Sequence, residues 1–419
     1  MKYFLPDSQD LVDPGYDFER EAHAPNRVRE RDDRYAHEIF GAGERVFDGI
    51  LVSKAIVDGF GAAGAARYTQ AQRRTILHEG VRALFRLTGP AFADVACMGD
   101  CGAFTYVEQA APPYTVDEVI EFYVRCGFDL GLSVDHVIAE YRPDWDTGLF
   151  ATTAPEAVRA RQELTLDLAA ELLARHRRER LRFVPIGVAQ GYSPRSYACA
   201  FSRLQAMGYT YVALGGIVRL RTRAILECLQ AIAEVRRPQT KIHLLGVSRL
   251  SHLTAFAALG VASVDSTSPL RQAFMDDAHN YHTPEGTYAA IRVPQVTRSP
   301  TLVARIRAGE IEEGAARAAE ALCLRRLAAY ARHAVAIEPV LAALGAYEEL
   351  CMSGRSRIEA YRRTLADRPW ERCTCAICRT LGHHVILFRG AERNRRRGFH
   401  NVGVFYRRLR AAIGRACEA

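Results

Sequence analysis

Long apolar runs are the first feature that the sequence lacks. No stretch approaches the roughly 18 apolar residues that a membrane-spanning helix needs, and the start, from Met1 to Ser8, has no apolar segment of the signal-peptide kind. A cytoplasmic protein with no membrane partner is therefore expected. Lysine is also scarce, because Lys2, Lys54 and Lys241 are the only lysines among 56 basic residues.

A disulfide framework is absent as well. The eleven cysteines are an odd number and mostly stand singly in apolar segments, where cysteine behaves as a small hydrophobic residue. The 419 residues, 49% hydrophobic and 25% charged, have ordinary globular composition and suffice for one large domain or two medium ones.

Positive charge is concentrated at the end of the chain. From Arg372 onward there are eleven arginines against Glu392 and Glu418, a balance of +9, whereas the whole chain has a net charge of +8. Clustered arginine attracts a phosphate backbone and thus indicates nucleic-acid binding. The scarcity of lysine leaves a second explanation open, namely that coding bias accounts for part of the arginine content.

Short β-rich apolar runs alternate with longer amphipathic segments between residues 46 and 297. The expected helices include 116–126, 154–176, 193–207, 221–235 and 250–259. The expected strands are 47–52, 94–98, 130–134, 183–188, 211–214, 242–245, 262–264 and 289–293. Eight strands alternating with helices favour an α/β fold of the (β/α)₈ TIM-barrel type over an open doubly wound sheet.

Polar or glycine residues follow six of these expected strands. Because the carboxyl ends of barrel strands converge on one mouth, such residues are candidates for an active site. They are Asp100, Asp135, Gln190, the pair Gly215 and Gly216, Gly246 and Asp265. The simpler explanation, that polar residues merely begin loops, accounts poorly for so many.

The chain is expected to have four parts. These are an N-terminal arm (1–45), the barrel with the active site (46–298), a helical segment (299–370) and a basic zinc-binding subdomain (371–419). Within the arm, the highly charged stretch 17–34 is expected to be a solvated arm or a surface helix. The helical segment should be broken at Pro339 and near Gly354.

Three thiols within six residues indicate a metal site. Cys373, Cys375 and Cys378 form a Cys-x-Cys-x-x-Cys knuckle, which supplies three of the four ligands that tetrahedral Zn²⁺ takes. From the residues alone the fourth ligand stays open among three histidines, which are His383, His384 and His400. Four protein ligands leave no open position, so the metal should be structural.

Two aspartates end buried strands and are followed by small residues. Asp100 and Asp265 are of the kind that suits chemistry at an anomeric carbon, where one carboxylate attacks and another moves a proton. As bare residues they prove little, because an aspartate after a strand is more often a helix N-cap.

The motifs in order resemble the tRNA-guanine transglycosylase superfamily, base-exchange enzymes with a (β/α)₈ barrel and a zinc subdomain. The resemblance runs from about Phe47 to Tyr406. The run 100–104 (Asp-Cys-Gly-Ala-Phe) resembles the family's Asp-Ser-Gly-Gly-Phe/Tyr, which implies that Asp100 is the general acid/base and that Phe104 stacks on the base. Asp265 falls where the family's nucleophile belongs.

The same resemblance implies the base pocket and the fourth zinc ligand. Asp135 and Gln190 match the residues that read the base, the second within a Gly-x-x-Gln-Gly element. The pair 215–216 matches a Gly-Gly turn that offers backbone N–H groups, and in the run 243–247 (His-Leu-Leu-Gly-Val) Leu245 takes the place of an apolar wall residue. The family's zinc pattern ends in His-Asn, which favours His400.

Departures from the family pattern bear on the substrate. Ala103 replaces a glycine, Thr105 stands where a glutamine is usual, and the loop 266–271 reads Ser-Thr-Ser-Pro-Leu-Arg instead of Cys-Val-x-Pro-Thr-Arg. Together with the basic run 389–401, these features look more like the DNA-modifying branch, which inserts 7-cyano-7-deazaguanine into DNA. Residues expected to contact nucleic acid are Arg271, Arg389, Arg393, Arg395, Arg396 and Arg397.

The resemblance implies a reaction in which guanine in DNA is replaced by 7-cyano-7-deazaguanine through a covalent aspartyl-glycosyl intermediate. The expected partners are nucleic acid, guanine and the incoming 7-deazaguanine base, with a helper protein for strand opening as a further partner. Three alternatives stay open: exchange in tRNA, removal of the base without replacement, and a non-catalytic zinc-containing subunit that binds nucleic acid.

Overall fold

The computed structural model describes residues 1–7, 10–41, 43–61, 67–147, 152–352, 354 and 356–418. By their contacts these residues form two compact units. Unit 1 comprises Met1–Gln9, Phe47–Thr267 and Leu409–Ala419, and unit 2 comprises Asp10–Val46 and Ser268–Arg408. The expected division of the chain into an arm, a barrel, a helical segment and a zinc-binding subdomain stays a prediction.

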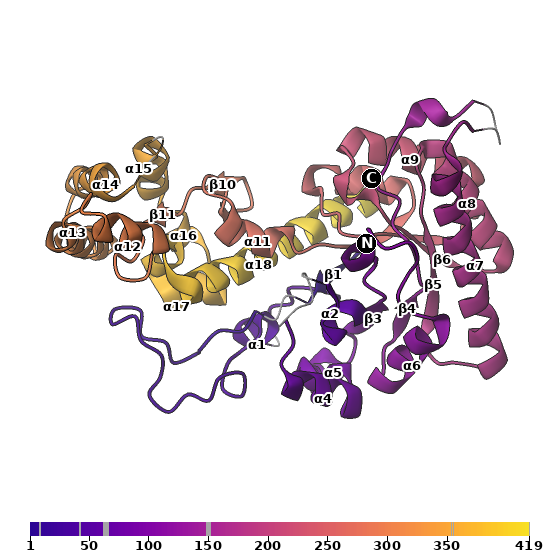
Figure 1. Ribbon diagram of the computed structural model, residues 1–419. Coiled ribbons are helices and arrows are strands. Elements are labelled where there is room, and N and C mark those ends of the chain that lie inside the picture. Colours follow the sequence, from indigo (N-terminus) through magenta and orange to yellow (C-terminus); the bar gives the residue numbers. More distant parts are fainter. Residues whose placement is uncertain are drawn as a thin grey trace. The chain divides into compact units, whose positions relative to one another are not determined.

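Unit 1 is built on a closed barrel of eight strands, which confirms the predicted (β/α)₈ fold (Figure 1). Every neighbouring pair of strands is parallel. The strands are β1 (Lys2–Pro6), β2 (Gly49–Ser53), β3 (Ala96–Asp100), β4 (Leu130–Leu132), β5 (Val184–Ala189), β6 (Tyr211–Leu214), β7 (Lys241–Leu244) and β8 (Val261–Asp265).

The first strand of the barrel differs from the expectation. Strand β1 lies in the predicted N-terminal arm, pairs with β2 and β8, and buries Tyr3 and Phe4. The expected eighth strand, 289–293, contributes instead β11 (Ile291–Arg292), which pairs with β12 (Leu387–Phe388) in unit 2. The run Tyr-Phe-Leu before Pro6 is short and no helix follows it directly, so the alternating pattern did not include it.

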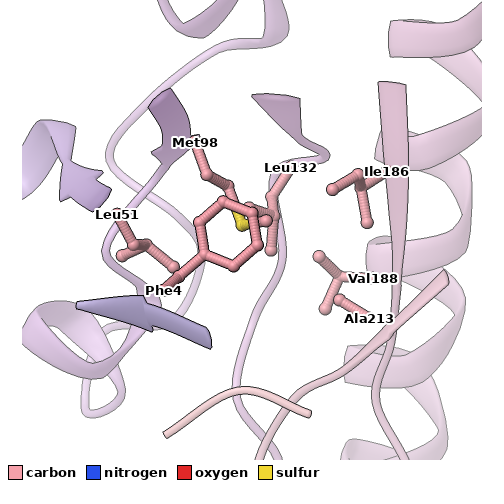
Figure 2. Packing of buried hydrophobic residues seen from close by; sticks show 7 residues of the cluster. All are labelled: Phe4, Leu51, Met98, Leu132, Ile186, Val188 and Ala213. Carbon is pink, nitrogen blue, oxygen red and sulfur yellow. The ribbon is translucent and has the colours of Figure 1, made fainter. Parts of the chain in front are cut away.

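Side chains from successive strands fill the barrel (Figure 2). Phe4 of β1 packs with residues of β2 to β6, which are Leu51, Met98, Leu132, Ile186, Val188 and Ala213. Gly49 on β2 makes room for this packing, since a Cβ atom there would lie 2.4 Å from the Phe4 ring. The interior is therefore a packed core, and functional groups are left to the strand ends.

Helices follow most strands of unit 1, and some of them begin and end at caps that the sequence supplies. Helix α6 (Val116–Cys126) has a capping box, in which Thr115 Oγ1 accepts from the Glu118 N–H (3.2 Å) and Glu118 accepts from the Thr115 N–H (2.8 Å). It ends at Gly127, whose φ of 72° suits a left-handed cap. The other helices are α2 (Lys54–Asp58), α4 (Gln70–His78), α5 (Val81–Leu84), α7 (Glu156–Glu179), α8 (Pro194–Met207), α9 (Thr222–Val235) and α10 (Leu253–Ala258), with short 3₁₀ turns η1 (Pro90–Phe92), η2 (Ala103–Tyr106), η3 (Pro143–Trp145), η4 (Ile217–Arg219) and η5 (Leu250–His252).

Unit 2 is mainly helical. Pro339 does not break a helix but lies in the first turn of α14, where its missing N–H costs no hydrogen bond. The elements are α1 (Ala36–Phe40), α11 (Ser268–Met275), α12 (Pro300–Arg307), α13 (Glu313–Ala331), α14 (Ile337–Cys351), α15 (Ile358–Asp367), α16 (Pro369–Arg372), α17 (Ala376–Leu381), η6 (Gly382–Ile386) and most of α18 (Gly390–Glu418), with the two-stranded pairs β9 (Tyr281–His282) with β10 (Thr287–Tyr288) and β11 with β12.

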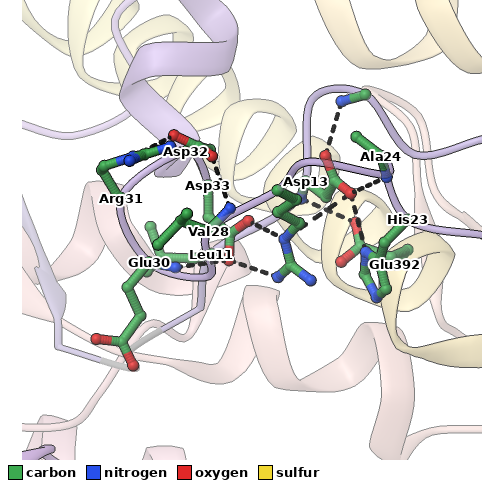
Figure 3. Close-up of polar contacts among 12 residues, drawn as sticks. Leu11, Asp13, His23, Ala24, Val28, Glu30, Arg31, Asp32, Asp33 and Glu392 are labelled. Atoms are coloured by element: carbon green, nitrogen blue, oxygen red, sulfur yellow. Dashed lines mark hydrogen bonds and ion pairs between the residues drawn. The ribbon is translucent and has the colours of Figure 1, made fainter.

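The charged stretch 17–34 is not a helix, and many of its residues are exposed, as expected for a solvated arm. It belongs to an irregular segment held by side chains of the segment and by Glu392 of α18 (Figure 3). The buried Asp13 accepts from the N–H groups of Gly15 and Ala24, at 2.9 and 3.0 Å, and its own N–H donates to Glu392 of α18 (3.2 Å). Asp33, also buried, is paired with Arg27. Carboxylates that satisfy backbone donors take the place of regular secondary structure here.

None of the helices in the described ranges has both the length and the apolar character needed to cross a bilayer.

Candidate active site and metal centre

The end of β3 carries a carboxylate in an unusual environment. Asp100 is the last residue of the strand, and its ligand atoms lie with those of Cys101 and Asp135 within 4.8 Å of one another. Burial, and then the charge of Asp135, raise the pKa of Asp100 to about 7. Asp100 therefore holds a proton over part of the neutral pH range, as a general acid must.

Asp135 follows β4 and is buried in a small polar network. The Gln190 amide Nε2 donates to its Oδ2 (2.5 Å), and the Cys101 thiol donates to its Oδ1 (3.1 Å). The Tyr106 hydroxyl in turn donates to Cys101 Sγ at 3.0 Å. Burial raises the pKa of Asp135 to about 6, although the Cys101 and Gln190 donors lower it. The structure thus brings together the expected base-reading pair, Asp135 and Gln190.

The glycine pair after β6 is shaped around Gln190. A Cβ atom at Gly215 would lie 2.2 Å from Gln190 Nε2, and one at Gly216 would lie 2.8 Å from Gln190 Oε1. Gly216 also has a φ of 74°, a conformation that glycine adopts without strain. Gly215 is fixed by its carbonyl, which accepts from the Tyr197 hydroxyl (2.7 Å). A larger residue at either position would displace the Gln190 amide from its hydrogen bond to Asp135.

The two apolar residues expected in the pocket differ in exposure. Phe104 lies on η2 and keeps 46% of its surface exposed, which is unusual for a phenylalanine and leaves the ring available for stacking. Leu245 follows β7 and is partly buried against the barrel core. Their placement is compatible with the expected roles, which stay predictions.

Asp265 ends β8 and is buried, with 5% exposed. Its Oδ1 accepts from the Gly246 N–H (2.9 Å) and lies 3.0 Å from His243 Nε2. One backbone N–H and one imidazole nitrogen thus contact the same carboxylate oxygen. The charge of Asp265 also contributes to the raised pKa of Asp100, so the two carboxylates interact electrostatically.

In unit 2, Cys373, Cys375, Cys378 and His400 form the cluster expected from the sequence. Their ligand atoms lie within 4.8 Å of one another. His384, one of the three candidates for the fourth position, instead lies 3.2 Å from a Glu19 carboxylate oxygen. His383 is likewise outside the cluster found among the described residues.

The spacing of these four side chains fits a tetrahedral metal ion. His400 Nδ1 lies 3.4 Å from Cys375 Sγ, 3.4 Å from Cys378 Sγ and 3.9 Å from Cys373 Sγ. Zinc at its usual distances from sulfur and nitrogen would separate those atoms by about 3.6 Å. The cluster could therefore hold a metal ion, and its donor set suits Zn²⁺.

Neighbouring groups orient the histidine of the cluster. The His282 carbonyl accepts from His400 Nε2–H (2.7 Å), which leaves Nδ1 unprotonated and directed at the thiols. The Tyr281 ring stacks on the imidazole, with centroids 4.3 Å apart. Asn401 accepts from the His282 N–H and donates to the Asn280 carbonyl. The asparagine of the His-Asn pair thus fixes the backbone that orients His400.

Four of the arginines expected to bind phosphates are buried in unit 2. These are Arg389, Arg393, Arg396 and Arg397, none more than 5% exposed. Glu21 accepts from Arg389 at 2.6 and 2.7 Å and from Arg393 at 2.5 Å. Burial raises the pKa of Glu21, but hydrogen bonds from Arg389 and Gln295 outweigh it and lower the pKa to about 2.

The guanidiniums of the other two buried arginines are also hydrogen bonded to groups of the protein. Arg396 pairs with Glu392, and Arg397 donates to the carbonyls of Val385, Leu387 and Ala273. A guanidinium that is buried and hydrogen bonded to protein acceptors presents little surface to a phosphate, so the placement of these four arginines argues against the expected contact. The arginine run is amphipathic on α18, and the sequence alone did not reveal which face is covered.

The remaining two arginines are accessible. Arg271 on α11 is exposed, and its Nε lies 3.3 Å from Met275 Sδ. Arg395 keeps 34% of its side chain exposed and lies 3.4 Å from an Asp10 oxygen. Only these two of the six candidates can reach a nucleic acid without rearrangement of the unit.

Comparison with known proteins decides the family. The chain is 46% identical over 423 aligned residues to the DNA-guanine transglycosylase of Salmonella montevideo, with 100% of this chain and 99% of the relative covered. This chain belongs to the DNA-guanine transglycosylase family. That family consists of pentosyltransferases.

A more distant similarity links the family to RNA-modifying enzymes. The chain is 28% identical over 196 residues to the tRNA-guanine(15) transglycosylase of Pyrococcus abyssi (strain GE5 / Orsay), which covers 45% of the chain and 30% of the relative. No family model matches the chain. The resemblance to the superfamily, and to its DNA-modifying branch, is thereby confirmed.

Two contacts in this candidate site were not anticipated from the sequence. Cys101 stands where the superfamily motif has serine and hydrogen bonds to Asp135. His243 contacts Asp265, although it lies within strand β7 rather than at its end. The available signal was a histidine in the short strand Lys-Ile-His-Leu, three residues before Gly246.

Proposed function

We propose that this chain replaces guanine in DNA with a 7-deazaguanine, 7-cyano-7-deazaguanine, through a covalent aspartyl-glycosyl intermediate on Asp265. The name of the Salmonella relative, similar over nearly its full length, supports guanine exchange in DNA. The target nucleotide must leave the base stack before its glycosidic bond can be reached.

One observation carries the mechanism: two carboxylates at strand ends lie in different environments. Asp265 Oδ1 accepts from the Gly246 N–H and lies 3.0 Å from His243 Nε2, whereas burial and the Asp135 charge raise the pKa of Asp100 to about 7. Such a pair divides into a nucleophile and a general acid. Asp265 attacks C1′, the C1′–N9 electron pair leaves with guanine, and Asp100 protonates the leaving base.

The second half of the exchange reverses these steps. The incoming base loses a proton to the Asp100 carboxylate and attacks C1′, which releases Asp265. Phe104 stacks on the base, Asp135, Gln190 and the Gly216 N–H hydrogen bond to its edge, and Gly215 and Leu245 shape the pocket. A 7-deazaguanine keeps the edge that these groups contact, so one pocket accepts both bases.

Unit 2 supplies binding in this proposal. Cys373, Cys375, Cys378 and His400 hold a structural Zn²⁺ that stabilises the fold without an open coordination position. Arg271 and Arg395 contact phosphates, which gives affinity without sequence information.

The proposal is tested by incubating the full-length chain with radiolabelled guanine and either DNA or tRNA. We expect label to enter DNA, with DNA offered both as duplex and as single strand. Label only in tRNA would reassign the substrate, abasic product would indicate hydrolysis, and no change in either would indicate a binding protein.

Asp265→Asn supplies the matched variant. Its amide oxygen can still accept from Gly246 and His243, so the fold should be kept, yet we expect covalent trapping of DNA to vanish and exchange to fall by about a thousand-fold or more. Retained exchange in this variant would remove Asp265 as the nucleophile. A denaturing gel and the label assay measure the two effects.

A further inference from the structure

A chain of hydrogen bonds reaches Asp265 from inside the barrel. His243 Nε2 lies 3.0 Å from Asp265 Oδ1, and His243 Nδ1 lies 2.5 Å from Ser263 Oγ. Ser263 Oγ is also hydrogen bonded to the Tyr211 hydroxyl. Both His243 and Ser263 are fully buried. Four side chains from β6, β7 and β8 are thus linked in one line.

The chemistry of the acceptor fixes the direction of these bonds. An ionised carboxylate only accepts, so the proton between His243 and Asp265 belongs to Nε2. In a neutral imidazole Nδ1 is then the acceptor, and the Ser263 hydroxyl donates to it. Ser263 in turn accepts from Tyr211. The Phe4 ring packs edge-on to the imidazole, with centroids 5.9 Å apart, and limits its rotation.

These contacts distinguish the two oxygens of Asp265. Across the described part of the chain, the donors to this carboxylate reach Oδ1, from Gly246 on one side and His243 on the other, and none reaches Oδ2. We propose that His243 is a positioning residue, which holds Oδ1 with its Nε2–H so that Oδ2 is the oxygen that attacks C1′. This inference rests on the proposed role of Asp265 as nucleophile.

The attack then follows with a balanced set of bonds. The Oδ2–C1′ bond forms, the C1′–N9 bond breaks, and the base takes its proton from Asp100. In the resulting ester Oδ1 is a carbonyl oxygen, which still accepts from Nε2–H and the Gly246 N–H. His243 transfers no proton in this step and acts only by fixing the rotation of the carboxylate about its Cβ–Cγ bond.

A pair of variants of nearly equal shape separates positioning from packing. His243→Gln places a side-chain N–H near the position of Nε2, whereas His243→Met has no donor there. We expect kcat of guanine exchange to fall about 10- to 100-fold in His243→Met, as for loss of a hydrogen bond to a charged group, with KM for DNA within about threefold. His243→Gln should recover most of kcat.

Other results of this comparison would overturn the proposal. Equal losses in the two variants, a rise in KM alone, or an unchanged kcat in His243→Met would each show that the imidazole only fills space. Because the Met variant can lose its fold, Ser263→Ala serves as a second test. It frees the imidazole to adopt the other tautomer, and we expect a kcat loss of about threefold to tenfold with an unchanged melting temperature; an unchanged kcat would contradict the chain of bonds.

A spectroscopic measurement distinguishes failure of this inference from failure of the proposed function. If the wild-type chain exchanges no guanine in either nucleic acid, the function fails, and the nitrogen shifts of ¹⁵N-histidine still test the contact. We expect the His243 signal, assigned from its absence in His243→Gln, to show protonated Nε2 and to shift in Asp265→Ala. An Nδ1–H tautomer, or a signal indifferent to Asp265→Ala, would overturn the contact itself.

Discussion

Two clusters of charged groups, one in each unit, differ in how their charges are balanced. In unit 2 the guanidiniums of Arg389 and Arg393 meet the carboxylate of Glu21. In unit 1 the carboxylate of Asp100 lies beside that of Asp135, and the charge of Asp135 adds to the effect of burial in raising the pKa of Asp100. Buried charges that are paired indicate structure, whereas buried like charges at strand ends indicate chemistry.

The strongest way to break this comparison is to remove the carboxylate from the arginine cluster. Glu21→Ala leaves Arg393 without its carboxylate partner and Arg389 with only Glu320. We expect a loss of about 3 kcal/mol in unfolding free energy, because a broken buried pair leaves a charge uncompensated. Denaturant unfolding measures the loss.

The neighbouring Glu19 provides the matched control. Its side chain is 72% exposed and pairs with His384, so Glu19→Ala should cost less than about 0.5 kcal/mol. If Glu21→Ala instead kept its stability and bound DNA more tightly, Arg389 and Arg393 would be phosphate ligands covered by an acidic segment, and the structural interpretation of the cluster would be wrong.

This pairing also shows where prediction from sequence stopped. The arginine run is visible in the sequence, but Glu21 stands 368 residues before Arg389 and nothing local joins them. Strand β1 was missed because its run is short and because one of its partners lies far along the chain, since Phe4 pairs in register with Asp265 of the neighbouring strand β8. Long-range partners are decided by packing, which periodicity does not report.

Elements with local signals were predicted well. Helix α6 agrees with its expected bounds because a capping box and a terminal glycine mark both ends. The thiols of the metal cluster follow from their spacing, and the family resemblance selected His400. Asp100, Asp135, Gln190 and Asp265 could be proposed as site residues because strand ends of a barrel converge, whereas His243 could not, since it lies inside a strand.

A second prediction tests the opposite side of the comparison. Burial and Asp135 raise the pKa of Asp100 from its ordinary value of 3.8 to about 7, so the folded chain favours the protonated acid. Stability of the wild type should therefore fall as pH rises from about 4 to 7, and Asp100→Asn, which cannot ionise, should escape this loss.

We expect Asp100→Asn to be more stable than the wild type by on the order of 2 kcal/mol at pH 8, with the difference shrinking toward pH 4. Thermal melts across this range measure it, alongside an exchange assay in which the variant should be nearly inactive. A stability difference that is independent of pH would mean that Asp100 is ionised in the folded chain and is not the general acid.

The smallest expected effect concerns the arginines that unit 2 leaves accessible. Arg271 is exposed on α11 and, within the described ranges, has no carboxylate partner, unlike the buried Arg389, Arg393 and Arg396. If it contacts one phosphate, Arg271→Ala should weaken DNA binding by about 1 kcal/mol and reduce the slope of log affinity against log salt by about 0.9. Arg223→Ala removes an equal charge from an exposed arginine that pairs with Glu227 on α9, and should change neither quantity. Fluorescence anisotropy measures DNA binding of both variants. Equal effects in the two would mean that net charge controls affinity, rather than a defined contact at Arg271. Exposure would then not distinguish the arginines that bind DNA from those that stabilise the fold.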